Sequence, residues 1–245
     1  MTTMLLLWQT GLPDGGPVYT ETDLSQPVVE PWNAVSAFMF LLVVLYWAFK
    51  LKGQYQQHPF LAYVLPVLTI GGIGGTIYHA FRYSELFLLM DWVPILILCL
   101  SAGFYFLMKA LDSWKPAVLI TIGVFLLERM VFEIFSPRIA VNVSYIVLAS
   151  FVLLSTWLML HKKAYFQGKY VGYALLTFMV AIFFRIADRW EWLPMGTHFL
   201  WHTFGALACY LMIHYVYALN AGDKVKVKSF VSKEDVTEEE KLNAG

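Results

Sequence analysis

The sequence predicts an all-α protein, an integral membrane bundle of seven transmembrane helices. Hydrophobic residues make up 59% of the 245 residues, charged residues only 14%, and the mean hydropathy is +0.63. Soluble domains are roughly 45–50% apolar. A run of about 20 mostly apolar residues can cross a bilayer as a helix, and the sequence contains seven such runs: 33–51, 60–80, 87–109, 116–135, 141–160, 170–187 and 196–219.

The connectors between these runs carry helix breakers or charges, which indicates where each helix ends. In order they read KLKGQYQQHP, FRYSE, LDSWKP, SPR, HKKAYFQGK and DRWEWLP. The fourth run is the least regular, because Glu128, Arg129 and Glu133 interrupt it.

Three regions follow from this division. Residues 1–32 form a polar N-terminal segment, residues 33–219 the membrane domain, and residues 220–245 a charged tail that we expect to be mobile. The chain start lacks a basic region, so we expect no cleaved signal peptide. Cys99 and Cys209 both lie inside apolar runs and are interpreted as small core residues that form no disulfide.

The distribution of basic residues predicts the orientation. Lysines gather after the first, third and fifth helices and in the C-terminal tail, whereas the opposite side has only Arg82, Arg138, Arg185 and Arg189 near helix ends. Cytoplasmic loops carry the excess of Lys and Arg. We therefore expect the N-terminus outside and the C-terminus in the cytoplasm. The formal net charge of zero gives no indication of a nucleic-acid partner.

Four ionisable residues then fall at similar depth on the outer side. His79 ends the second helix, Asp91 lies near the start of the third, and His198 and His202 lie in the first two turns of the seventh. Ionisable groups inside a membrane are costly, so they usually face the bundle interior and have partners. The topology therefore predicts that these four residues meet.

The histidine pattern favours a metal. Residues four apart share one helical face, so His198 and His202 can bind one ion, with His79 as the third ligand. Three protein ligands leave a fourth position for water, which is typical of catalytic zinc. Asp91 would act as general base or hold a histidine in the correct tautomer. The alternative is that the histidines are only interhelical hydrogen-bonding groups.

Three other histidines, His58, His161 and His214, are interpreted as interfacial or structural. A haem would need histidines on separate helices that face each other. His214 is the obvious extra candidate, but it lies about 18 Å along the helix axis from His202 and points in another direction.

The N-terminal segment contains its own oxygen donors, Glu21, Asp23, Glu30 and Asn33. Calcium takes six to eight oxygen ligands from loops of this kind. The residues alone favour the plainer alternative, an acidic solvated loop in which Asn33 caps the first helix or bonds across it.

Several stretches resemble the alkaline ceramidase family, specifically its bacterial branch. They are EPWNAVSAF at 30–38, GGIGGTIYHAF…MDWVPIL at 71–96, and above all PMGTHFLWH at 194–202. The resemblance spans nearly the whole chain in the same order. The wider group includes the adiponectin/progestin receptors and lipid hydrolases that remodel GPI anchors, which are similar seven-helix proteins with a three-histidine zinc site.

The resemblance implies a zinc-dependent amidase that cleaves the N-acyl bond of ceramide into sphingoid base and fatty acid. It implies His79, His198 and His202 as zinc ligands and Asp91 as the acidic residue that works with the attacking water. It further implies Glu21, Asp23 and Glu30 as calcium ligands that brace the N-terminal segment against the helices.

The chain departs from the family pattern at a few positions. Gly75, with Thr76 adjacent, stands where a serine is usual near the zinc, and Val18 replaces a calcium-binding carboxylate. Thr20 replaces a cysteine, and the DRWEWLPMG connector has no cysteine to pair with one. Loss of a hydroxyl at position 75 removes a hydrogen-bond partner for the reacting oxygen, which can cost roughly 10²–10³ in rate.

We therefore expect a membrane zinc hydrolase that acts on a lipid amide such as ceramide, in a bacterial inner membrane, with the zinc site facing outward. The rival hypothesis is a receptor-like or lipid-binding membrane protein in which zinc is structural and turnover is negligible. The Gly75 departure favours this rival.

Overall fold

The computed structural model describes residues 12–242, and within that range it contains helices and no strand. The all-α prediction is thus confirmed for the described part of the chain. The helices are α2 (Pro31–Ala37), α3 (Met39–Lys50), α4 (Pro59–Phe81), α5 (Glu85–Leu111), α6 (Trp114–Ile134), α7 (Pro137–Lys162), α8 (Gly168–Ala187) and α9 (His198–Leu242), with short 3₁₀ helices η2 (Tyr55–Gln57) and η3 (Asp188–Trp190).

Local sequence signals explain several helix ends. Pro31 and Pro59 stand in the first turns of α2 and α4, where a missing N–H costs nothing. The Ser84 hydroxyl accepts the backbone N–H of Leu86 and so caps α5. Arg82 and Asp112 adopt left-handed backbone conformations that end α4 and α5.

Among the described residues, six segments are long and apolar enough to cross a membrane, as is typical of an integral membrane protein. They are Pro31–Lys50, Pro59–Phe81, Glu85–Leu111, Ile139–Lys162, Gly168–Trp190 and His198–Ala221. The first spans both α2 and α3, which meet at Phe38 with only a local irregularity.

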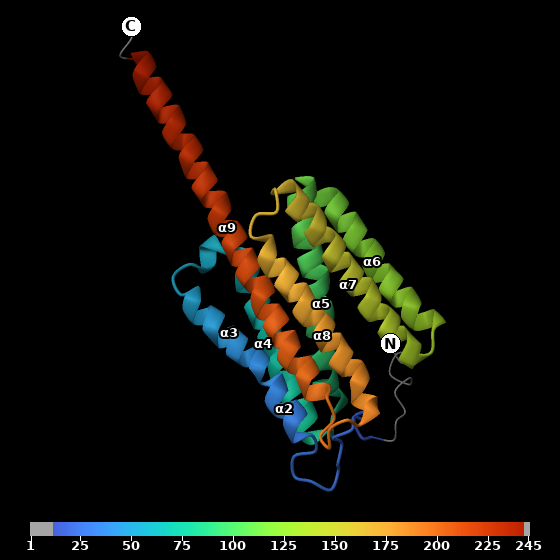
Figure 1. Cartoon of the computed structure of the whole chain (residues 1–245). Helices are drawn as coiled ribbons and strands as arrows, with labels where there is room; N and C mark the ends of the chain where they lie inside the picture. Colours follow the sequence, from blue (N-terminus) through green and yellow to red (C-terminus); the bar gives the residue numbers. More distant parts are fainter. Residues whose placement is uncertain (1–11, 243–245) are drawn as a thin grey trace.

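Helix α6 is the predicted span that does not belong to this set, because Glu128, Arg129 and Glu133 lie in its C-terminal half. It packs beside α5 and α7 in the bundle (Figure 1). Glu128 is buried and accepts a hydrogen bond from Ser144 of α7. Arg129 and Glu133 form an exposed ion pair at 3.0 Å.

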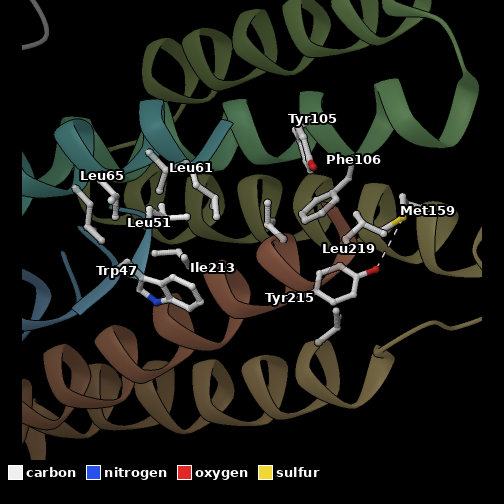
Figure 2. Close-up of a cluster of buried hydrophobic side chains, with 14 of the residues drawn as sticks. Trp47, Leu51, Leu61, Leu65, Tyr105, Phe106, Met159, Ile213, Tyr215 and Leu219 are labelled. Carbon is white, nitrogen blue, oxygen red and sulfur yellow. Dashed lines mark hydrogen bonds between the residues drawn. The ribbon is translucent and has the colours of Figure 1, made fainter. Parts of the chain in front are cut away.

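The main hydrophobic core fills the half of the bundle that contains the C-terminal end of α3 and the start of α4. Figure 2 shows side chains from α3, α4, α5, α7 and α9 interdigitating there, with the Tyr215 hydroxyl 3.8 Å from the Met159 sulfur. Trp47, Leu51 and Leu61 are at most 1% exposed. This core includes residues of both α4 and α9, and both helices run from it toward the histidines.

The described part of the chain begins and ends at opposite ends of the bundle. The segment before α2 lies at the end where α9 begins, and the C-terminal part of α9 projects from the other end (Figure 1). We predicted that the last helix ends at 219, but α9 continues as a helix to Leu242. Gly222 lies within this continuation, where a glycine costs about 1 kcal/mol, but residues 223–242 contain neither glycine nor proline. Residues 1–11 of the predicted N-terminal segment, where a signal peptide would lie, and residues 243–245 of the predicted tail fall outside the described range.

The remaining sequence expectations concern cysteines and outlying histidines. Cys99 and Cys209 are free, as predicted. The ring of His58 stacks on Tyr217 at 4.7 Å, and the ring of His214 lies 4.2 Å from that of Tyr170. These aromatic contacts agree with a structural role for both histidines.

Candidate metal centre

The structure brings His79, His198 and His202 together in a buried cluster. They are 0%, 3% and 4% exposed. The centroid of the His79 ring lies 5.4 Å from that of His198 and 4.8 Å from that of His202, and the latter two are 4.7 Å apart. One nitrogen from each ring falls within 4.8 Å of the other two. The prediction that topology brings the three histidines together is confirmed, and the cluster could hold a metal ion.

The start of α9 is fixed by Asp188 of η3. Its Oδ1 accepts the backbone N–H groups of Thr197 and His198 at 2.8 and 3.0 Å. A carboxylate at this position satisfies free N–H groups and complements the helix dipole. Gly196 precedes this turn with φ +68°, and a Cβ there would stand 2.2 Å from Asp188 Oδ1. Glycine is therefore required for the turn that places His198.

The N-terminal segment is tied to the same turn. The Thr20 N–H donates to Asp188 Oδ2 at 3.1 Å, and the Thr20 hydroxyl donates to the Asp188 carbonyl at 2.6 Å. Position 20 is where the family resemblance implies a lost cysteine. Here two hydrogen bonds join the segment to the connector before α9.

In two of the three histidines, His79 and His202, one ring nitrogen is hydrogen-bonded and the other is available to a ligand. Nδ1 of His202 lies 3.2 Å from the Asn33 carbonyl and 3.0 Å from the Ser36 hydroxyl. A carbonyl only accepts, so Nδ1 carries the proton and Nε2 keeps its lone pair. Nδ1 of His79 lies 2.5 Å from Glu30 Oε2, and its Nε2 is buried without a partner. Such hydrogen bonds fix the tautomer and orientation of metal-ligating histidines.

The third histidine, His198, is oriented by packing. Its Nδ1 is buried and makes no hydrogen bond, and the ring of Tyr19 stacks on it with centroids 3.9 Å apart and planes at 32°. Orphaned buried ring nitrogens are costly unless a ligand satisfies them. Two nitrogens that share a tetrahedral zinc are about 3.4 Å apart, so small ring movements bring this set to ligand distance. The three histidines therefore fit a metal ion.

Asp91 lies on the wall of the cavity beside the cluster. The cavity has a volume of about 70 Å³, and Tyr19, His198 and His202 also line it. Room for several water molecules follows from that volume. No described residue forms a hydrogen bond with the Asp91 carboxylate, and the acceptors that orient the histidines are Glu30 and Asn33. Of the two roles predicted for Asp91, the orientation of a histidine is therefore performed by Glu30 and Asn33 instead.

Glu30 stands at the centre of a buried charge network. Its Oε1 accepts hydrogen bonds from Arg82 and, at 2.6 Å, from Thr22, while its Oε2 bonds His79. Arg82 Nε also donates to Asp14 Oδ2 at 2.5 Å, and both side chains are fully buried. Burial raises the pKa of Glu30, but the hydrogen bond to His79 and the positive charge of Arg82 outweigh it and hold that pKa below its ordinary value.

Sequence reasoning did not assign Arg82, Asp188, Ser36 or Tyr19 to the site. Arg82 offered a signal, because it follows His79 by three residues and its charge faces an acidic N-terminal segment. Tyr19 and Asp188 lie in irregular segments, where no periodicity indicates which way a side chain points. Burial raises the pKa of the Tyr19 phenol above its ordinary value.

The three residues predicted for calcium each have their own partners. Glu21 accepts the N–H groups of Trp32 and Asn33 at 2.6 and 2.9 Å and so caps α2, a role we had considered for Asn33. Burial raises the pKa of Glu21. Asp23 is exposed and accepts the Ser25 hydroxyl at 2.6 Å, which lowers its pKa. Calcium binding at Glu21, Asp23 and Glu30 stays a prediction.

The remaining predicted neighbours lie on α4 and α2. The Thr76 hydroxyl donates to the Gly72 carbonyl at 2.7 Å, one turn earlier on the same helix. Gly75 lies against Asp91, and the Asn33 amide donates to Glu30 Oε2 at 3.3 Å. Helix α4 thus presents no free hydroxyl from positions 75 and 76.

No protein-family model matches the sequence, and no curated protein shows significant similarity to it.

Proposed function

We propose that this chain is a zinc-dependent membrane hydrolase that cleaves the N-acyl amide bond of ceramide or a related lipid into fatty acid and free amine. The observation that carries the proposal is the buried histidine cluster, in which His79 and His202 are each held with one nitrogen free beside a cavity that Asp91 lines. Hydrogen-bonded histidines beside an unpaired carboxylate are the groups that metal-assisted hydrolysis requires.

The donor set favours zinc. Imidazole nitrogens suit zinc among the transition metals, and three protein ligands with an open fourth position are typical of a catalytic site. When bound, zinc polarises a carbonyl and lowers the pKa of water at the site to about 7.

Asp91 would accept the proton of the attacking water and pass it to the leaving amine. No described hydrogen bond has to break before it can do so. The cavity wall behind it is mostly apolar, which suits a fatty acyl chain next to the scissile carbonyl. Its lining includes Phe40, Leu68, Trp92, Ile95, Leu98 and Trp201.

The topology that accompanies this function has seven spans, with α6 as the fourth, and lies in a bacterial inner membrane. The lysine distribution supports an outward-facing N-terminal segment and site. The buried Glu128 and its partner Ser144 remove one charge of α6 from lipid contact.

The test compares the purified protein with His198→Ala for bound metal and for release of fatty acid from a short-chain ceramide. His161→Ala, a histidine outside the cluster, is the matched control. We expect about one zinc per chain in wild type and control, and loss of both zinc and turnover in His198→Ala. Less than half a zinc in the wild type, or equal turnover in all three proteins, would overturn the proposal.

A receptor-like or lipid-binding protein with a structural metal is the second candidate. The observation in its favour is that Gly75 has no hydroxyl and the Thr76 hydroxyl is bonded to Gly72. Stoichiometric zinc together with bound lipid, and no product release from any acyl amide, would establish it.

A further inference from the structure

Tyr19 brings a side chain from outside the helices onto the metal cluster. Its ring stacks on His198 with centroids 3.9 Å apart and lies 5.4 Å from the ring of His79. It lines the same cavity as Asp91 and His202. The phenol therefore lies beside the histidines and within the space that a reacting group would occupy.

The contacts of Tyr19 leave its hydroxyl free. Within residues 12–242, the side-chain contacts of Tyr19 are ring contacts with the two histidines and with the guanidinium of Arg82, whose Cζ lies 5.7 Å from the ring centroid. A phenolic hydroxyl can both donate and accept a hydrogen bond. Among the described groups that line the cavity are thus a free acceptor, the Asp91 carboxylate, and a free donor, the Tyr19 hydroxyl.

The backbone around Tyr19 is fixed on both sides. The Tyr19 N–H donates to the Thr22 hydroxyl at 2.9 Å, and Thr20 makes its two hydrogen bonds with Asp188. The stacked ring restricts the side chain further. A donor fixed before substrate arrives stabilises developing charge without a reorganisation cost.

We propose that the Tyr19 hydroxyl donates a hydrogen bond to the acyl oxygen of the lipid substrate and is a further catalytic residue of the site. This inference rests on the proposed hydrolase function and deepens it. Tyr19 supplies the donor that α4 does not offer, since position 75 is glycine and the Thr76 hydroxyl is occupied.

The step balances without proton transfer from Tyr19. As the water oxygen bonds to the carbonyl carbon, the π electron pair moves to the acyl oxygen, and the Tyr19 hydroxyl donates to it. The water proton goes to Asp91. When the C–N bond breaks, the electron pair on the acyl oxygen re-forms the C=O bond of the carboxyl group, and the amine leaves with the proton from Asp91.

The experiment removes the hydroxyl alone. Tyr19→Phe keeps the ring that stacks on His198, and Tyr83→Phe, at an exposed tyrosine near the same end of the bundle, is the matched control. We expect Tyr19→Phe to lower kcat/KM for short-chain ceramide by about 10²–10³. Zinc content and Tm should equal those of the wild type. Tyr83→Phe should change none of these quantities.

A second readout separates this inference from the proposed function. The Kd for lauric acid, whose carboxylate has the same acyl oxygens, is measured by calorimetry in detergent on the zinc-loaded proteins. We expect the Kd for laurate to be at least about tenfold higher in Tyr19→Phe, because a hydrogen bond to a charged group is lost. If the wild type hydrolyses no amide but Tyr19→Phe still weakens laurate binding, the hydrolase proposal and the catalytic role of Tyr19 fail, and only the hydrogen bond from Tyr19 to an acyl oxygen holds.

Three results would overturn the assignment. The first is wild-type turnover and laurate affinity in Tyr19→Phe. The second is loss of zinc in Tyr19→Phe, which would make the ring packing responsible. The third is a wild-type protein that neither turns over an acyl amide nor binds laurate.

Discussion

The carboxylate of Asp91 lies directly against Gly75: a Cβ built on Gly75 would stand 2.4 Å from Asp91 Oδ1. Real Cβ atoms do not approach a heavy atom so closely, so a side chain at position 75 would have to displace Asp91. The glycine that removes a hydroxyl from α4 is therefore also what lets α5 bring its carboxylate to the cavity.

Gly75→Ala should separate stability from activity. Alanine is favoured over glycine inside a helix by about 1 kcal/mol, which offsets part of the roughly 1–3 kcal/mol that displacing a packed group costs, so we expect Tm to fall by only a few degrees. Displacement of Asp91 by about 1 Å should lower ceramide turnover by roughly 10²-fold. Gly123→Ala, on α6 with open space around the new Cβ, is the control and should leave turnover unchanged. Unchanged turnover in Gly75→Ala would show that the Asp91 position does not limit catalysis.

Glu30→Gln should weaken metal binding. The amide cannot replace the carboxylate between Arg82 and His79, so Arg82 loses half of its buried charge compensation and His79 its anionic partner. We expect 10–100-fold weaker zinc affinity and a loss of about 3–5 kcal/mol in stability. Zinc competition with a chromophoric chelator and denaturation in detergent measure the two effects.

The control for that change is Glu133→Gln, which breaks the exposed pair with Arg129. Exposed pairs contribute about 0–1 kcal/mol, and this one is remote from the histidines. Equal zinc affinity in Glu30→Gln and Glu133→Gln would contradict the role assigned to Glu30.

Asp188→Ala should loosen the start of α9. It removes the acceptor for the N–H groups of Thr197 and His198 and for the backbone of Thr20, and a lost cap costs about 0.5–2 kcal/mol. We expect lower zinc affinity and faster proteolysis of the N-terminal segment. Asp112→Ala, at the exposed pair with Lys162, should affect neither. If Asp188→Ala keeps full zinc affinity and its N-terminal segment still resists proteolysis, the role assigned to Asp188 is contradicted.

Zinc removal should destabilise the folded protein. A ligand present at one hundred times its Kd stabilises by about 2.7 kcal/mol, so a chelator should lower Tm and added zinc should restore it. His198→Ala should show no response to either. A wild-type Tm that does not respond to chelator or zinc would contradict a resident metal.

Labelling of single cysteines should decide whether α6 crosses the membrane. In a background without Cys99 and Cys209, we expect Ser136→Cys to react with an impermeant maleimide in intact cells. Asp112→Cys should react only after permeabilisation. Reaction of both under the same condition would place both ends of α6 on one side, leaving six spans and contradicting the seven-span proposal.

The helical part of the architecture was predictable because a membrane imposes strong rules on sequence. Long apolar runs gave six of the spans, and polar residues at matched depth indicated that His79, His198 and His202 would meet. The charges of α6 make its apolar run weaker than the others, and the sequence does not show that Glu128 finds a partner, Ser144, in the folded bundle. The continuation of α9 beyond 219 reflects local helix propensity, which a prediction based on apolar runs does not consider.

The groups that orient the histidines were less predictable. Glu30 was identified as an oxygen donor, but its partners Arg82 and His79 are 52 and 49 residues away in the chain. Asp188 and Tyr19 lie in segments without helical periodicity, so their directions depend on hydrogen bonds between parts of the chain that are remote in sequence.

The site also has a consequence for biosynthesis. Its parts come from residues 14–36, from residues 79–91, and from residues 188–202, where α9 begins. A nascent chain therefore lacks two of the three histidines until that helix has been made and inserted. Under the proposed function, this order of synthesis would keep a partly assembled bundle from holding the metal or reacting with the surrounding lipid.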